Sequence, residues 1–365
     1  MKFIISREKL VVLISKVQNV VPSKAVVPIL SNILLEAKND VITLYATDLT
    51  VSVKVSVDVN IVQEGAITLP AKRFFQLTRE LTAPEITVET SETGIARITA
   101  GSSHFRLHGM DKEEYPPFPQ DDEGKHFTMK GADLKDMLMR TSFSAAKDDT
   151  RQVLNGVFME IIGNRILFVG TDGKRLAKVH GQLDLFEPID FSNIIPLKAV
   201  EELVRVLIDE DDVRITLMED KISVEMGNFC LISKLITGQF PDYERVIPDH
   251  SELREIKLHR EELMTLLKQI SLFTPDASHS VKLTFLDGEL RLQATNSDIG
   301  EGKVHMPVDY RGDKKEIAFN PHYVLDVLRH CKDETVNFCM TDSFNPGSIT
   351  DTSDAHYVIM PMRLG

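Results

Sequence analysis

A short string occurs three times in this sequence at a constant interval. YATDLTVS, VGTDGKRL and QATNSDIG each carry a central threonine, at Thr47, Thr171 and Thr295, and 124 residues separate each threonine from the next. One short match would carry little weight, but self-similarity at a fixed period indicates repeated structural units. Any fold for this chain therefore has to accommodate three successive copies of one unit.

Other features recur in the same order. A proline opens a helix-like stretch in each copy, at Pro70, Pro196 and Pro321, and Tyr115-Pro116 returns as Phe240-Pro241. The whole chain has 365 residues, which exceeds what one hydrophobic core usually serves. We therefore predict three tandem copies of one domain, at residues 1–124, 125–252 and 253–365.

Each copy combines helical and strand patterns. Leu10, Leu13, Ile14 and Val17 lie on one helical face, and Ser6 stands where an N-cap would. The valines from 51 to 59 alternate, which is typical of a strand. Helices are expected at residues 7–18, 72–80, 130–140, 198–207, 259–270 and 321–332. Because strand-like runs outnumber them, we predict an α+β fold with helices on one face of antiparallel sheets.

Composition indicates an ordinary globular protein of a reducing compartment. Apolar residues make up 42% and charged residues 27%, and the cysteines Cys230, Cys331 and Cys339 form no CxxC pair. This pattern argues against a disulfide framework and a structural zinc site. MKFIISREKL lacks the apolar core of a signal peptide, and no run approaches a membrane span. We expect a cytoplasmic protein without a membrane partner.

The net charge of −13, taken alone, disfavours a nucleic-acid partner. The six expected helices, however, carry +6 between them, which leaves −19 for the remainder. If the helices share one surface, that surface is basic and the opposite one acidic. A general preference of helices for lysine would give the same numbers.

A search for catalytic motifs finds none that calls for an enzyme. GTDGKR at 170–175 has the wrong glycine spacing for a phosphate loop, and no G-x-S-x-G elbow is present. His104 and His108 fall in a strand-like stretch, so a helical metal pair is not expected. Asp48 and Asp172 correspond to Asn296 in the third copy, which favours turn residues over catalytic acids. We predict no catalytic residue, no metal and no cofactor.

Three stretches nevertheless resemble one family. The string TDGKRLA, the segment GQFPDYERVIP and the ending YVIMPMRL are similar to the bacterial DNA polymerase III beta subunit, a sliding clamp. The resemblance covers essentially the whole chain. It implies a head-to-tail homodimer that forms a six-domain ring around double-stranded DNA. It also implies that the ring tethers the replicative DNA polymerase and is opened by a separate ATP-dependent clamp loader.

The resemblance assigns residues to two surfaces of such a ring. Scattered basic side chains would contact phosphates without reading bases, which gives weak and salt-sensitive attraction. The candidate DNA-binding residues are Lys24, Arg73, Arg106, Arg151, Lys198 and Arg205. The candidate dimer-interface residues are Phe105, Leu107, Leu272 and Phe273. Gln152-Val153 stands where some relatives carry aromatics, so stacking on DNA is not expected there.

The resemblance also implies a hydrophobic groove for partner proteins. Replication and repair proteins would insert a short motif with Gln, Leu and Phe, and adaptable Met residues suit such ligands. The candidate groove residues are Leu154, Thr171, Gly173, Lys174, Arg175, Leu176, Pro241, Arg245, Val246, Asn320, Tyr323, Phe344, Val358, Met360, Pro361, Met362 and Arg363. Gly365 extends past the usual terminal Leu364, which would place the terminal carboxylate near this groove.

A segment of the chain itself has the composition of the partner motif. GQLDLF, residues 181–186, contains Gln182, Leu183 and Phe186 in the order that the groove would accept. These residues either pack within the second copy or allow weak self-association. Two other functions stay open: a peptide-binding adaptor that does not encircle DNA, and a hydrolase or ligand-binding protein of three similar domains.

Overall fold

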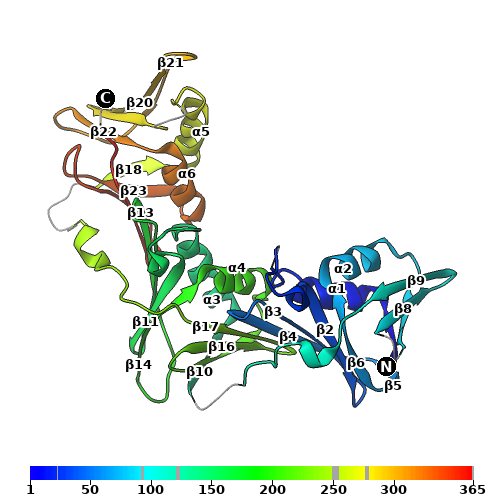
Figure 1. Ribbon diagram of the computed structural model, residues 1–365. Coiled ribbons are helices and arrows are strands. Elements are labelled where there is room, and N and C mark those ends of the chain that lie inside the picture. Colours follow the sequence, from blue (N-terminus) through cyan, green and yellow to red (C-terminus); the bar gives the residue numbers. More distant parts are fainter. Residues whose placement is uncertain (23, 92–93, 121–123, 249–254, 276–278, 364–365) are drawn as a thin grey trace. The chain divides into compact units, whose positions relative to one another are not determined.

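The structure is a computed structural model that describes residues 1–22, 24–91, 94–120, 124–248, 255–275 and 279–363 (Figure 1). Its contacts divide the chain into two compact units. Unit 1 contains Met1–Lys135 and Lys198–Leu235, and unit 2 contains Asp136–Leu197 and Ile236–Gly365. The expected boundary at residues 252 and 253 and the terminal Gly365 lie outside the described residues. Within those residues, no helix is long and apolar enough to cross a membrane.

Unit 1 is built on two antiparallel sheets. The described strands of its smaller sheet follow the spatial order β5 (Asn60–Gln63), β1 (Lys2–Ser6), β7 (Glu85–Thr90), β8 (Ile95–Ala100) and β9 (Ser103–His108). Those of its larger sheet follow the order β10 (Lys125–Lys130), β15 (Asp212–Leu217), β16 (Lys221–Met226), β17 (Phe229–Lys234), β4 (Val51–Asp58), β3 (Val41–Thr47), β2 (Asn32–Lys38) and β6 (Gly65–Pro70).

Unit 2 also contains two antiparallel sheets. The described strands of its larger sheet are, in spatial order, β14 (Ile189–Pro196), β11 (Gly156–Gly163), β12 (Arg165–Thr171), β13 (Arg175–Gln182), β25 (Ala355–Ile359), β24 (Gly347–Thr350), β23 (Thr335–Cys339) and β18 (Ile256–His259). Those of its smaller sheet are β21 (Gly300–Pro307), β20 (Glu289–Asn296), β19 (Val281–Leu286) and β22 (Lys315–Phe319).

The helices confirm the predicted positions to within two residues at either end. They are α1 (Arg7–Val17), α2 (Ala71–Glu80), α3 (Gly131–Ser142), α4 (Leu197–Val206), α5 (Arg260–Ser271) and α6 (Pro321–His330). In unit 1, α1 lies beside α2 and contacts β3 and β4; in unit 2, α5 lies beside α6 and contacts β20 and β21 (Figure 1). The α+β prediction with antiparallel sheets is therefore confirmed.

The helix ends follow from local chemistry. Ser6 caps α1 as predicted, because its hydroxyl accepts a hydrogen bond from the Lys9 N–H at 3.3 Å. Asn320 caps α6 in the same way, and Pro321 occupies its first position, where no N–H partner is needed. Pro70 and Pro196 differ from the prediction, since each is the last residue of a strand and only precedes its helix.

The larger sheet of each unit joins strands from two successive repeats. In unit 1, β17 pairs with β4, with Leu231 opposite Val53. In unit 2, β13 pairs with β25, with Leu176 opposite Val358. The sequence patterns predict the strands but carry no sign of this pairing, because an edge strand and a central strand can show the same alternation.

The repeated string forms the same turn in the first two copies. The Thr47 hydroxyl donates to the Val51 carbonyl at 3.1 Å, and the Thr171 hydroxyl donates to the Arg175 carbonyl at 2.7 Å. The next residue is aspartate in both copies, and its Oδ1 accepts two backbone N–H groups. In the third copy, Asn296 Oδ1 accepts one such bond at 2.9 Å. The repeat therefore preserves a turn rather than a reactive group.

Candidate functional site

The turn between β12 and β13 forms one end of a candidate site in unit 2. Gly173 has a φ of +81°, a conformation that glycine adopts without steric cost. Its N–H donates to the Thr171 hydroxyl at 3.1 Å, while the N–H groups of Lys174 and Arg175 donate to Asp172 Oδ1. These bonds fix the backbone from which Arg175 projects.

Arg175 is held from two directions. Its guanidinium donates to Asp172 at 3.2 Å and to Asp326 of α6 at 2.7 Å. It also lies over the ring of Tyr323, 4.7 Å from the centroid, and over that of Phe143 at 5.4 Å. Its side chain is only 12% exposed. Arg175 therefore adds a side-chain link between the second and third repeats to the strand pairing of β13 with β25.

The last strand of the chain completes this side of the site. Val358 lies opposite Leu176, and the Met360 N–H donates to the Lys174 carbonyl at 2.8 Å. Two residues later, the Met362 N–H donates to the Ala318 carbonyl at 2.7 Å. The segment that follows β25 is thus tied to both sheets of unit 2.

An apolar cluster lies on the face of the large sheet that carries Leu176. This groove cluster consists of Val169, Leu176, Ile194, Phe240 and Val358, all buried. Phe240 comes from a segment, residues 240–247, that crosses this face, and its ring stacks on Phe158 with centroids 4.8 Å apart. Val153, Tyr243 and Ile247 pack against the cluster from its edges.

All seventeen candidate groove residues belong to unit 2. Four of them are buried, namely Leu154, Thr171, Leu176 and Val358. The exposed apolar members are Pro241, Val246, Phe344 and Met360, with Phe344 the most exposed at 84%. The turn of Phe344 is held by Asp342, and no described contact joins it to the groove cluster. Among the remaining members, Gly173, Lys174 and Arg175 form the turn between β12 and β13, and Asn320 and Tyr323 lie at the start of α6.

Several participants are absent from the sequence-based assignment. Phe158, Phe240 and Tyr243 build the stacked aromatic wall, and Asp326 holds Arg175. Val153 packs against the groove cluster, which gives it a role in that wall in place of DNA stacking. The aromatic spacing in FPDY at 240–243 is the one signal that could have identified the wall in advance.

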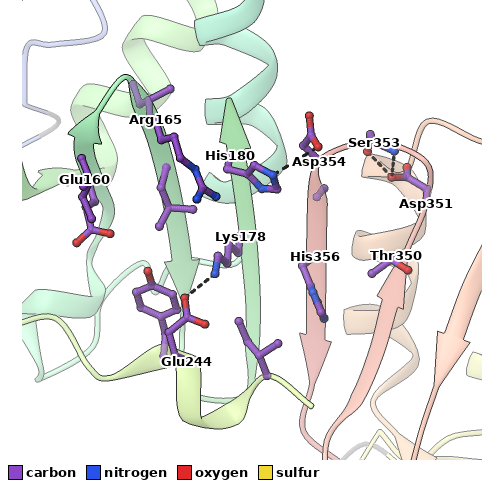
Figure 2. A pocket seen from close by; sticks show the side chains of 16 residues that line it. Glu160, Arg165, Lys178, His180, Glu244, Thr350, Asp351, Ser353, Asp354 and His356 are labelled. Carbon is purple, nitrogen blue, oxygen red and sulfur yellow. Dashed lines mark hydrogen bonds and ion pairs between the residues drawn. The ribbon is translucent and has the colours of Figure 1, made fainter. Parts of the chain in front are cut away.

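A hollow lies on the same sheet face as the groove cluster (Figure 2). Its volume is about 500 Å³, and Tyr243 lines it while also packing against the groove cluster. Lys178 of β13 donates to Glu244 at 2.5 Å and lies over the Tyr243 ring at 5.4 Å. Burial, with the carboxylates of Glu160 and Glu244 nearby, raises the pKa of Tyr243 well above its usual value. This hollow was not predicted from the sequence.

Three of the candidate DNA-binding residues project from the protein surface. Arg73 of α2 is exposed and bonds only to Gln76, at 3.4 Å, among the described residues. Lys24 and Arg106, the latter on β9, are also exposed. Their charges are available to a phosphate backbone.

Arg151 is paired with a neighbouring carboxylate. Its Nε and Nη2 each donate to Asp149 at 3.0 Å, in a bidentate arrangement. This pairing lowers the pKa of Asp149 to about 2. The Nη2 atom also lies 3.2 Å from where a Cβ would stand on Gly173, so the Arg151 side chain adjoins the groove turn.

Lys198 and Arg205 of α4 are engaged within unit 1. Lys198 donates to Asp48 at 2.5 Å and to the Val20 carbonyl at 2.6 Å. Arg205 donates to the Ser15 carbonyl at 2.6 Å, at the end of α1, where the helix dipole favours a cation. Arg205 also contacts Glu202. The Lys198 side chain is 36% exposed and so can still meet solvent.

Two of the candidate dimer residues lie on an edge strand, and the other two directly follow α5. Phe105 is 40% exposed on β9, which ends the small sheet of unit 1, and Leu107 follows on the same strand. Leu272, directly after α5, is 72% exposed. Phe273 packs against β21, since a Cβ at Gly302 would lie 3.0 Å from its ring.

In the part of the chain that the structure describes, no group of three or more His, Cys, Asp or Glu side chains could hold a metal ion. His104 and His108 lie on β9, a strand, as the sequence predicts. Cys230, Cys331 and Cys339 are all buried and form no disulfide within the described residues, and burial raises the pKa of the Cys331 thiol to about 12. Such a thiol is unsuited to act as a nucleophile at neutral pH.

Comparison with known proteins assigns the fold. Residues 1–119, 128–242 and 244–363 match, in this order, the N-terminal, central and C-terminal domains of the DNA polymerase III beta subunit. Crystal structures of that subunit from Pseudomonas aeruginosa (TM-score 0.93, 31% identity) and of the sliding clamp from Bartonella birtlesii bound to griselimycin (TM-score 0.94, 33% identity) superpose on it, with 100% of each chain covered. The repeated domain is that of the DNA clamps.

Relatives of known sequence narrow this class to one family. The chain is 48% identical to the beta sliding clamp of Chlamydia pneumoniae over 364 residues, covering 100% of this chain and 99% of that protein. It is 34% identical to the beta sliding clamp of Escherichia coli K12 over 373 residues, with both chains covered completely. The chain belongs to the DNA polymerase III beta subunit family, and it is a non-catalytic processivity clamp.

Proposed function

We propose that two copies of this chain close head to tail into a six-domain ring that encircles double-stranded DNA and holds the replicative DNA polymerase on it. The domains are placed at residues 1–124, 125–252 and 253–365, and the protein acts in the cytoplasm. A separate ATP-dependent loader opens the ring. Other replication and repair proteins share the groove by inserting a short Gln/Leu/Phe motif.

The proposed ring rests on one observation, which is that successive repeats share a sheet. In unit 1, β4 of the first repeat pairs with β17 of the second, and in unit 2, β13 of the second pairs with β25 of the third. By position in the repeat, β21 corresponds to β4 and β13, and β9 corresponds to β17 and β25. Both β9 and β21 stand at sheet ends among the described strands. Pairing β9 of one copy with β21 of another would make the same joint a third time.

The side chains at these two edges support that joint. Exposed strand edges are unstable as free surfaces and tend to be paired. Phe105 and Leu107 would lie on one side, with Leu272 and Phe273 on the other. Because each copy offers one edge of each kind, two copies close into a ring through two equal contacts.

DNA would be held inside by charge without base readout. Lys24, Arg73 and Arg106 offer exposed cations, while Arg151, Lys198 and Arg205 are shared with protein acceptors. Such partly neutralised contacts give attraction weak enough for sliding. The acidic remainder of the chain would discourage binding of DNA elsewhere.

The groove cluster and its exposed rim would receive the partner peptides. Pro241, Val246 and Met360 expose apolar surface, and Leu176 and Val358 belong to the buried groove cluster. A leucine or phenylalanine side chain would bury against this surface, and methionine adapts to different ligands.

The decisive experiment measures retention on circular and linearised plasmid after incubation with a clamp loader, at low and raised salt. Retention on the circle that survives salt, with loss after cutting, is expected for a topological link. Equal loss from both DNAs would contradict the ring and favour the adaptor that does not encircle DNA. A Leu272→Glu variant should lose the dimer mass in light scattering, whereas Leu49→Glu, an exposed leucine elsewhere, should keep it.

A further inference from the structure

The hollow of Figure 2 continues the groove cluster along one face of the large sheet of unit 2. Side chains two residues apart on a strand point to the same face. On β13, Leu176 of the groove cluster is therefore followed on this face by Lys178 and His180, and both line the hollow. On β25, the next residue on this face after Val358 is His356, which lies opposite Lys178. The groove and the hollow are thus two parts of one surface.

The two strands on the other side of β13 follow the same order. On β11, Phe158 packs against the groove cluster and the next residue on its face, Glu160, lines the hollow. On β12, Val169 of the cluster is likewise succeeded by Leu167, which lies opposite Glu160. Because a strand rises about 3.3 Å per residue, the hollow begins roughly 7 Å from the cluster and extends to roughly 13 Å. About four extended residues therefore reach from the groove across the hollow.

Three side chains with large apolar surfaces border both places. Tyr243, Ile247 and Leu167 line the hollow and also pack against the groove cluster. The volume of the hollow, about 500 Å³, falls within the range of known ligand pockets, which is about 300–1,000 Å³. A peptide seated on the groove cluster would therefore have the hollow directly beside it, with no change of sheet face in between.

The lining of the hollow carries an excess of negative charge. With histidines counted as neutral, it contributes four carboxylates and two cations, namely Glu160, Glu244, Asp351, Asp354, Lys178 and Arg165. Asp354 is 74% exposed and lies 3.4 Å from His180. Arg165 lies farther from the groove cluster than Glu160 does, opposite Ile162. The excess favours a positively charged ligand over an acidic one.

Glu160 is the carboxylate that such a ligand would meet first. Glu244 is paired with Lys178 at 2.5 Å, and the Asp351 side chain is 0% exposed and lies 3.7 Å from Arg140. Glu160, in contrast, is half-buried and forms no ion pair among the described residues. Its charge is therefore available on the side of the hollow that adjoins the groove cluster.

We propose that the hollow binds the residues that flank the clamp-binding motif in partner proteins, and that Glu160 selects a lysine or arginine among them. The inference rests on the proposed function of the groove and adds a determinant of specificity to it. The motif fills the apolar groove, while the basic side chain lays its aliphatic stem along Tyr243 and donates to Glu160. Partners that share the motif then bind with affinities that depend on the charge of their flanking residues.

The test is fluorescence anisotropy with the full-length protein and a labelled Gln-Leu-Asp-Leu-Phe peptide. The peptide is used alone and with four further residues at either end, which alternate serine with lysine or serine with glutamate. Alternation places both charged side chains on one side of an extended chain. At the end that points to the hollow, the lysine extension should tighten binding about fivefold, the effect of a partly screened ion pair. The glutamate extension at that end should weaken binding, and raised salt should reduce both effects.

Two variants of Glu160 and one control assign the effect to the hollow. In Glu160→Gln, the gain from the lysine extension, measured against the bare peptide on the same variant, should disappear. In Glu160→Lys, the preference should reverse, so that the glutamate extension binds more tightly. Glu36→Gln is the matched control, because Glu36 lies 124 residues earlier, at the equivalent place in the first repeat, and the net charge changes equally. It should keep the full gain.

Three results would overturn the inference. Equal gains from lysine extensions at both ends, or a gain that persists in Glu160→Gln, would indicate only general attraction to a protein of net charge −13. No gain at either end would contradict it directly. Failure of the bare peptide to bind would be a different result, since it would contradict the proposed groove itself.

Discussion

Arg175 and Asp326 lie 151 positions apart in sequence and are joined by a hydrogen bond of 2.7 Å between Nη1 and Oδ2. The bond ties the turn of the second repeat to α6 of the third, next to the groove cluster. Asp326 also accepts a hydrogen bond from Arg329 at 2.7 Å, so one carboxylate serves two guanidinium groups. Of these two guanidinium groups, only that of Arg175 borders the candidate peptide site.

Asp326→Asn should therefore weaken peptide binding. The loss of a charged acceptor lets Arg175 move away from Tyr323, which changes one wall of the groove. We expect the affinity for a fluorescent Gln-Leu-Asp-Leu-Phe peptide to fall roughly tenfold, the effect of one charge-assisted hydrogen bond. Arg329→Gln removes the other donor and should leave affinity within about twofold. Equal effects of both changes would contradict the assigned role of Arg175.

Replacing Arg140 of α3 should lower the free energy of unfolding by a large amount. It is 4% exposed and contacts Asp351, whose side chain is 0% exposed, together with the Tyr357 hydroxyl at 3.2 Å. Arg140→Met would leave the buried carboxylate without its cationic partner, with only the N–H groups of Lys332 and Ser353 and the Ser353 hydroxyl as donors, at a cost of about 3–5 kcal/mol in urea unfolding. Lys135→Met, on the same helix, breaks the solvent-exposed pair with Asp209 and should cost less than about 1 kcal/mol.

Asp48→Asn should strengthen attraction to DNA. The asparagine keeps an acceptor for the Thr50 and Val51 N–H groups but no longer neutralises Lys198. Binding to a short duplex at low salt, measured by anisotropy, should tighten, and the salt slope should steepen by about 0.9 for each additional phosphate that the protein neutralises. Adding Lys198→Ala should reverse the gain. If Asp48→Asn leaves the affinity for the duplex unchanged, Lys198 does not contribute to the DNA-binding surface.

His330 makes stability depend on pH. Burial lowers the pKa of its imidazole below 6.5, and the ring stacks on Phe143 with centroids 4.2 Å apart. The unfolded chain then binds more protons than the folded chain just below pH 6.5, so stability present above that value is lost as pH falls. His330→Gln should flatten the fall in unfolding free energy between pH 7 and 5. His108→Gln, on the exposed edge strand β9, should leave it unchanged.

Leu49 has a strained backbone at the position where the second repeat carries a glycine. It has a φ of +75° at the position equivalent to Gly173, whose φ is +81°. The left-handed conformation costs a leucine roughly 1–2 kcal/mol, and half of its side chain is exposed, so little packing is lost on removal. Leu49→Gly should raise the unfolding free energy by about 0.5–1 kcal/mol. The reverse change, Gly173→Leu, should lower it by more, because its Cβ would approach Arg151.

Local sequence patterns predict most of the helices and the repeat. The periodicity of Leu10, Leu13, Ile14 and Val17 placed α1 and its buried face, and all four are buried. The period of 124 residues indicated the repeat, because turn chemistry such as that of Thr47 and Thr171 is local. What the sequence could not supply were contacts between distant segments. Neither the pairing of β13 with β25 nor the bond from Arg175 to Asp326 produces a recognisable pattern in the neighbouring sequence.

The candidate sites also combine features that the sequence predicts with contacts that only the structure shows. Family resemblance indicated the groove residues by position, whereas the aromatic wall of Phe158, Phe240 and Tyr243 became visible only once the crossing segment was placed. Charge counts suggested a basic helical surface, but they could not tell the free Arg73 from Lys198, whose charge Asp48 neutralises. Such pairings depend on three-dimensional neighbours.

Sheets shared between repeats separate the unit of sequence from the unit of structure. A repeat holds its neighbour by backbone pairing along β4 and β17 or along β13 and β25, whatever the linker does. In the proposed ring, each copy takes part in three kinds of joint: β4 with β17, β13 with β25, and β21 with β9 of the other copy. Only the last of these has no peptide link across it. Circular permutation that moves the ends to another joint would keep every strand pair, and it would change only the joint at which a loader has to separate two molecules.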